Sequence, residues 1–221
     1  MKPLRVLIAC EYSGTVRDAF LRRGHEAMSC DLLPTDSPGP HYQGDVRDVL
    51  DYPWDLMIAH PPCTDLAVSG AAWFAKKRLA GAQQASASFF MMLSKADIPM
   101  IAIENPVCVM SSVWRKPDQV IQPWMFGHME QKATCLWLKG LPPLRPTNDV
   151  KKQMMELPRN VRERLHFLPP SEDRWKIRSQ TYQGIADAMA DQWAGQLELP
   201  LQAMVPVQET IAPHGASNCE R

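Results

Sequence analysis

The chain has 221 residues, of which 45% are hydrophobic, and it carries 24 basic and 24 acidic side chains. This length suits one domain with a sizeable core, and the neutral balance gives no net attraction for a polyanion. The six cysteines form no C-x-x-C pair, no signal peptide precedes them, and no apolar run approaches the roughly 20 residues that cross a bilayer. We expect a soluble, cytoplasmic protein with free thiols and no membrane partner.

Apolar runs alternate with helical segments along most of the chain. The pattern predicts strands over residues 4–10, 25–31, 54–60, 99–105 and 133–140. It predicts helices within 11–24, over 71–97 with a possible break at Gly81, and over 183–198. This alternation predicts an α/β fold whose mostly parallel sheet is covered by helices on both faces. Ligand sites in such folds lie at the carboxyl ends of the strands.

Chemically active residues gather at these predicted strand ends. In chain order they are Glu11, Ser13 and Gly14, then Asp31, Asp45, the run His60-Pro61-Pro62-Cys63, and Glu104-Asn105-Pro106. Prolines fix the backbone and remove amide donors, so the chain beyond Ile58 must leave the sheet as a stiff loop. Cys63 is therefore expected on a rigid support at the edge of the sheet.

This series of motifs resembles that of the cytosine carbon-5 DNA methyltransferases, in a compact form like that of small phage and prophage proteins. The resemblance runs from residue 5 to about 138 and returns at QGIADAMADQW, and its strongest parts are PPC and IEN. It implies a Rossmann-like methyltransferase core over 1–140 that uses S-adenosylmethionine. The cofactor contacts that it implies are Glu11, Ser13, Gly14, Asp31, Asp45, His60 and Pro61.

The resemblance also implies a covalent mechanism. Cys63 would add to carbon 6 of cytosine as a thiolate, whose pKa the surroundings can lower. Glu104, next to Asn105, would donate a proton to ring nitrogen 3, and a closed pocket that raised the pKa of Glu104 would suit this role. Lys132 lies in EQKATCLWL, where the family has Gln-x-Arg-x-Arg, and would supply a positive charge without the planar guanidinium fork.

A basic segment over 141–180 stands where the family carries a larger target-recognition domain. Its candidate nucleic-acid contacts are Lys151, Lys152, Arg174, Lys176 and Arg178, interleaved with aromatic residues. Nearby acidic residues make a solvated helix and loop an equal alternative. The expected partner is DNA, single- or double-stranded. Residues 181–198 are predicted to form a helix that returns to the core, and 199–221 a flexible tail.

Other interpretations remain open. One is a non-catalytic protein that binds nucleic acid or a partner on a methyltransferase fold, favoured by the unusual turn C-E-Y-S-G. Another is an exocyclic-amine DNA methyltransferase, although His60 and Cys63 replace the polar and aromatic residues of that motif. Asp31 and Asp45 also suit simple capping roles. The histidines show no ligand spacing, so no metal site is expected. The sequence does not decide between a monomer and a homo-oligomer.

Overall fold

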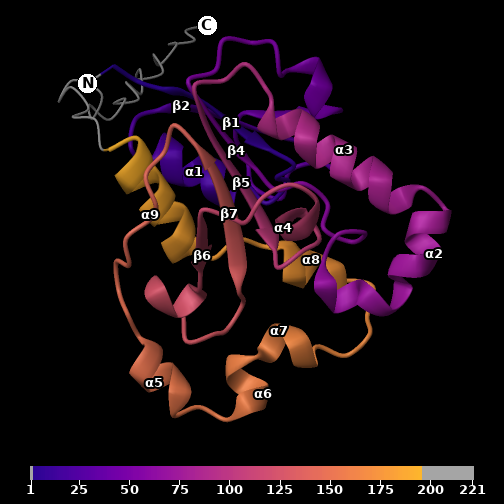
Figure 1. Ribbon diagram of the computed structural model, residues 1–221. Coiled ribbons are helices and arrows are strands. Elements are labelled where there is room, and N and C mark those ends of the chain that lie inside the picture. Colours follow the sequence, from indigo (N-terminus) through magenta and orange to yellow (C-terminus); the bar gives the residue numbers. More distant parts are fainter. Residues whose placement is uncertain (1, 196–221) are drawn as a thin grey trace, which may run out of the picture.

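A seven-stranded sheet organises the protein (Figure 1), as seen in a computed structural model that describes residues 2–195. The strands are β1 (Arg5–Ala9), β2 (Glu26–Asp31), β3 (His41–Gln43), β4 (Leu56–Ala59), β5 (Met100–Pro106), β6 (Gln119–Ile121) and β7 (Thr134–Lys139). Their order is β3-β2-β1-β4-β5-β7-β6, and β7 runs antiparallel to both β5 and β6, whereas the other pairs are parallel. The predicted Rossmann-like, mostly parallel α/β fold is confirmed.

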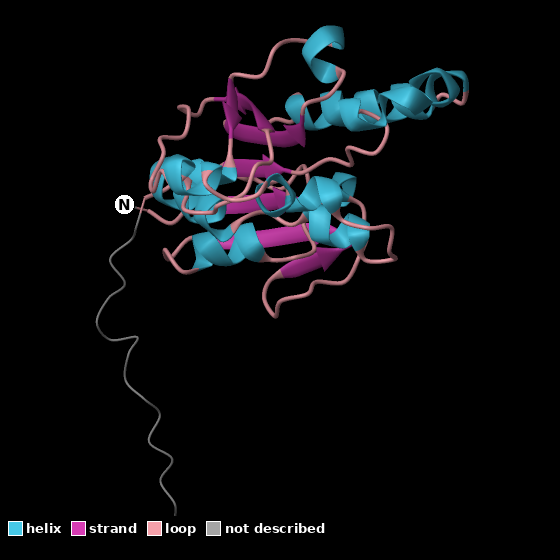
Figure 2. Ribbon diagram, turned by 90° about the horizontal axis from the view of Figure 1, so that it is seen from below, coloured by secondary structure: helices cyan, strands magenta, loops and turns pink. Residues whose placement is uncertain are grey.

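Helices lie on both faces of the sheet (Figures 1 and 2), with α1 and α9 on one face and α3 on the other. The α-helices are α1 (Thr15–Leu21), α2 (Phe74–Leu79), α3 (Ala82–Ser94), α4 (Met110–Val113), α5 (Lys151–Met155), α6 (Arg159–Arg162), α7 (Arg164–Phe167), α8 (Arg174–Ser179) and α9 (Gln183–Trp193). Three 3₁₀ turns complete them: η1 (Val46–Asp48), η2 (Val68–Trp73) and η3 (Pro123–Met125). None of the helices within 2–195 combines the length and apolarity needed to span a bilayer.

Several boundaries differ from the sequence prediction. The segment 71–97 is broken at Gly81, whose φ of 72° is left-handed, into α2 and α3, and its first residues form part of η2. Strands β3 and β6 were not predicted, because three residues are too few to show a period of two. The last part of the predicted helix 183–198 and the predicted tail 199–221 extend beyond the described residues.

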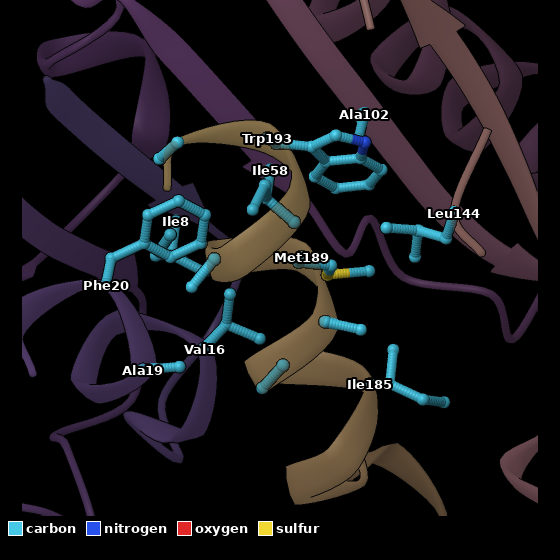
Figure 3. Close-up of a cluster of buried hydrophobic side chains, with 14 of the residues drawn as sticks. Ile8, Val16, Ala19, Phe20, Ile58, Ala102, Leu144, Ile185, Met189 and Trp193 are labelled. Carbon is cyan, nitrogen blue, oxygen red and sulfur yellow. The ribbon is translucent and has the colours of Figure 1, made fainter. Parts of the chain in front are cut away.

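Alternate residues of the central strands feed two separate cores. Ile8, Ile58 and Ala102 face α1 and α9 (Figure 3), whereas Leu7, Met57 and Ile101 face α3. Both faces of these strands are buried, which explains why the strands appear as continuous apolar runs in the sequence. The sheet edge, where polar residues replace the apolar ones, is thus held between two packed layers.

Helix α9, the last described helix, packs beside α1 near the start of the chain. Met189 is fully buried in the core that α1 and α9 share (Figure 3), and the indole nitrogen of Trp193 donates to the Pro142 carbonyl at 2.9 Å. On the surface, Arg22 of the α1 C-cap pairs with Asp187 at 2.9 Å. Apolar burial should dominate this contact, because exposed ion pairs contribute little to stability.

We therefore expect Met189→Ala to lower the free energy of unfolding by about 2–5 kcal/mol, the usual range for such a buried truncation. Arg22→Ala, which removes an ion pair from a half-exposed side chain, should change it by less than about 1 kcal/mol. Urea denaturation followed by circular dichroism measures both values. A loss for Arg22→Ala as large as that for Met189→Ala would contradict this assignment of the packing energy.

Candidate active site

Strand register aligns the candidate residues at one edge of the sheet. Ala9 is opposite both Cys30 and Ala59, and Ala59 is opposite Ile103. The residues that follow them therefore form a row across the carboxyl edge: Cys10, Asp31, His60 and Glu104. Because β7 is antiparallel, its first residue, Thr134, lies opposite Pro106. This direction brings Lys132, just before β7, to the same edge.

The turn after β1 is held by its own acidic residue. The Glu11 carboxylate accepts hydrogen bonds from the backbone amides of Val16 at 2.7 Å and Arg17 at 3.2 Å, and from the Ser13 hydroxyl at 3.1 Å. Glu11 thus satisfies free amides at the start of α1. The structure places Glu11 and Ser13 within the turn, so their observed role is to shape it. These amides are where a dinucleotide-binding fold holds pyrophosphate.

Arg17 fixes the loop that follows β2. Its guanidinium is fully buried and donates to the hydroxyls of Ser29 and Thr35 and to the Ser37 carbonyl, at 3.1, 3.2 and 2.9 Å. Gly14, with a φ of 75°, leaves room for this group, because a Cβ there would lie 2.5 Å from the Arg17 Nη2. Gly14 therefore serves the predicted site through the shape of the turn.

A cavity of about 330 Å³ opens beside the row, within the size range of small-molecule sites. Its lining residues are Cys10, Cys30, Asp31, Leu32, Gly44, Asp45, Val46, Arg47, Pro62, Ala85, Ser86 and Phe89. The predicted cofactor contacts Asp31 and Asp45 thus share one cavity. Each also caps local backbone, since Asp31 accepts from the Leu33 amide and Asp45 from the Arg47 amide, both at 3.0 Å.

Several residues of the cavity were not singled out in the sequence. Phe89 and Val46 provide apolar wall, and Phe89 had only the helical spacing of its neighbours as a signal. Cys10, expected to be an ordinary core residue, is half-buried, lines the cavity and has a left-handed φ of 60°. Such backbone in a non-glycine residue is strained and tends to occur at functional sites.

The proline loop carries Cys63 beside the cavity. The buried Asn105 amide donates to the Pro61 carbonyl at 2.9 Å, while Pro62 lines the cavity. The observed role of Asn105 is therefore to hold the loop, through the carbonyl of Pro61. The Cys63 carbonyl then accepts from the amides of Leu66 and Ala67, at 3.0 and 2.8 Å, and starts a new turn. These bonds give the thiol the rigid support that the two prolines predicted.

The Cys63 pKa is raised above its ordinary value. Burial is the main cause, the negative charge of Glu104 adds to it, and the positive charges of Lys132 and Arg178 oppose it. The thiol is therefore protonated at neutral pH, contrary to the expectation that its surroundings promote the thiolate. The charges of Glu104 and Lys132 thus both reach the Cys63 thiol.

Glu104 faces His60 rather than standing alone. The His60 Nδ1 lies 3.1 Å from the Glu104 Oε2, and the two side chains are only 11% and 18% exposed. Burial by itself raises the Glu104 pKa, but the hydrogen bond and charge of His60, with the charge of Lys132, outweigh it and leave this pKa lowered. The expected rise of the Glu104 pKa is therefore not found. His60, expected at the cofactor, instead contacts the candidate acid.

The predicted nucleic-acid contacts do not form one patch. Lys151 and Lys152 lie on α5, which stands apart from α8 in Figure 1, and the Lys151 Nζ lies 5.0 Å from the centre of the Trp124 ring. On α8, Lys176 pairs with Asp36 at 2.9 Å. Arg174 is half-buried on the same helix, whereas Arg178 is exposed and its charge reaches Cys63.

Helix α8 itself lies over the turn after β1. The Tyr12 hydroxyl donates to the Lys176 carbonyl at 3.3 Å and contacts the Ser179 hydroxyl at 3.1 Å. Further along, the Lys132 Nζ donates to the Gln180 carbonyl at 3.2 Å. The end of the basic segment thus forms one wall of the site. Among the described side chains, no three His, Cys, Asp or Glu residues are grouped to hold a metal ion.

No protein-family model matches the chain, and no curated protein matches it. Among solved structures, it is similar to the methyltransferase EhMeth of Entamoeba histolytica, with 13% sequence identity and a TM-score of 0.46. The match covers 68% of this chain and spans 58% of the length of that protein. The function is accordingly inferred from the residues of this chain.

The charges around Cys63 predict how its reactivity responds to substitution. Glu104→Gln removes a negative charge and should lower the Cys63 pKa, whereas Lys132→Met should raise it. Each unit of pKa changes the thiolate fraction about tenfold, so we expect iodoacetamide to modify Cys63 roughly three to ten times faster in Glu104→Gln, and more slowly in Lys132→Met. Peptide mass spectrometry at pH 7.5 follows Cys63 separately from the other thiols. Equal rates in the three proteins would show that these groups do not share a site.

Proposed function

We propose that this protein transfers a methyl group from S-adenosylmethionine to carbon 5 of cytosine in DNA, through a covalent bond between Cys63 and carbon 6. The observation that carries the proposal is that Cys63 follows β4 and Glu104 lies on the neighbouring β5, near enough for the Glu104 charge to raise the Cys63 pKa, while Pro62 lines a cavity of small-molecule size. A thiol and a carboxyl group are the nucleophile and the acid that this reaction needs. The compact 141–180 segment does not favour single-stranded over double-stranded DNA as the substrate.

The cavity suits an adenosine derivative without phosphate groups. Asp31 would accept hydrogen bonds from ribose hydroxyls, and Val46 and Phe89 would pack against the adenine ring. The Glu11 carboxylate already occupies the amides at the start of α1, so a pyrophosphate there would meet a negative charge. S-adenosylmethionine bound in this cavity would supply an electrophilic methyl group.

The side chains near Cys63 would have separate roles around the pyrimidine ring. As the Cys63 thiolate adds to carbon 6, electron density moves toward ring nitrogen 3, where a proton from Glu104 neutralises it. Lys132 and Arg178 offset the negative charge near the thiol. After methyl transfer, water takes the proton from carbon 5, the electron pair of that bond re-forms the double bond between carbons 5 and 6, and sulfur leaves as the Cys63 thiolate. The loop that Asn105 anchors limits the freedom of the thiol, which favours attack.

Because fluorine at carbon 5 cannot leave as a proton, a 5-fluorocytosine oligonucleotide should trap the protein. We expect a denaturation-resistant adduct, seen on denaturing gels, that requires S-adenosylmethionine and is absent in Cys63→Ala. Cys108→Ala, which truncates another thiol outside the proline loop, is the matched control and should still form it. Cofactor binding without an adduct would favour methylation of an exocyclic amine. Neither cofactor binding nor an adduct would favour a protein that only binds nucleic acid.

Cofactor binding tests the cavity separately from the reaction. Asp31→Ala should weaken S-adenosylmethionine binding roughly 5- to 150-fold, the effect of losing hydrogen bonds to a charged acceptor worth about 1–3 kcal/mol. Asp36→Ala removes an acid that pairs with Lys176 outside the cavity and should leave the affinity unchanged. Isothermal titration calorimetry measures both. Equal affinities for the wild-type protein and Asp31→Ala would place the cofactor elsewhere.

A further inference from the structure

His60 joins the two parts of the candidate site. It follows β4 directly, and its backbone amide donates to the Ala9 carbonyl at 2.9 Å, so the strand pairing fixes where the side chain begins. On one side in the row stands Cys10, which lines the cavity, and on the other stands Glu104. The ring is thus placed between the proposed cofactor cavity and the proposed acid.

The other nitrogen of this ring is also informative. The His60 Nε2 is buried and has no hydrogen-bond partner in the protein, although the Nδ1 is bonded to Glu104. Buried polar atoms are rarely left unpaired unless a ligand or water completes them. The Asn105 Oδ1, in the residue after Glu104, is buried and unpaired in the same way. Two such atoms thus lie on or directly after neighbouring strands, beside the pair of His60 and Glu104.

The side chains around Glu104 determine which of them could supply it with a proton. Glu104 is faced by His60 and Lys132, and its own charge acts on the thiols of Cys63, Cys108 and Cys135. The three thiols around it are weak acids and are protonated at neutral pH. His60, whose Nδ1 lies 3.1 Å from the Glu104 Oε2, is therefore the neighbouring side chain placed to give Glu104 a proton.

We propose that His60 holds the proton that Glu104 passes to the substrate base, so that the two side chains act as one acid. This inference rests on the proposed function and assigns His60 a positioning and proton-supplying role. Without a proton from His60, Glu104 would be ionised when the reaction needs it to be an acid.

The proton balance is simple. Before reaction, one transferable proton is shared between the Nδ1 of His60 and the Oε2 of Glu104. As sulfur forms its bond to carbon 6, the electron pair of the double bond between carbons 5 and 6 shifts through the ring. Glu104 passes this single proton from the Nδ1 to nitrogen 3 and is left as a carboxylate. His60 is left neutral, with its remaining proton on Nε2. Elimination of sulfur returns the proton by the same route.

The test is the pH dependence of adduct formation. The single-turnover rate with a 5-fluorocytosine oligonucleotide and S-adenosylmethionine is measured from pH 5 to pH 8 for the wild-type protein, His60→Gln and the control His166→Gln, an exposed histidine on α7. An ordinary carboxyl loses its proton about two pH units below an ordinary imidazole. The defect of His60→Gln should therefore be small at pH 5 and grow to at least tenfold at pH 8. His166→Gln should follow the wild type throughout.

A spectroscopic measurement detects the shared proton in the wild-type protein itself. In wild-type protein labelled with ¹⁵N-histidine, the shared proton should give a downfield Nδ1 resonance at neutral pH that Glu104→Gln abolishes. A defect of His60→Gln that is the same at every pH, or the absence of this resonance, would overturn the proton-sharing role. If the wild-type protein forms no adduct, the proposed function fails and the relay fails with it. If it forms an adduct and the pH profiles coincide, the relay alone fails.

Discussion

The in-register pairing of β1, β2, β4 and β5 is the constraint on which the candidate site depends. The register of these parallel strands places residues far apart in the chain side by side, so Cys10, Asp31, His60 and Glu104 form one row at the edge of the sheet. Two apolar cores, one on each face, hold this edge in place. The antiparallel direction of β7 then brings Lys132 to the same edge, from a strand that would otherwise present its far end.

At that edge, burial and charge act against one another. Glu104 disfavours the thiolate of Cys63, while His60 and Lys132 favour ionised Glu104. The resting protein is therefore a thiol beside a carboxylate, whereas the proposed reaction starts from a thiolate beside an acid. A shared proton on His60 would lessen this mismatch, because Glu104 would then gain a proton without taking it from the thiol. Substrate binding has to supply the rest.

The compact architecture closes the site with few residues. The buried Arg17 ties the loop after β2 to the turn after β1, and α8 covers that turn through Tyr12. Part of the positive charge of segment 141–180 is paired within the protein, as the ion pair of Lys176 with Asp36 shows. A DNA surface, if it follows the proposal, would therefore centre on groups near the site such as Arg178, rather than on all the basic residues.

The sequence alone determined the α/β class, the principal strands and the residues at their ends, because apolar runs and prolines act locally. It did not reveal the short strands β3 and β6, whose three residues carry no period. Only the tertiary structure decided which atoms meet: that His60 contacts Glu104, that Glu11 closes its own turn, and that Cys10 lines the cavity. The protonation of Cys63 and Glu104 was also decided there. A side chain's pKa depends on burial and on charges brought near by folding, and neither can be read from spacing along the chain.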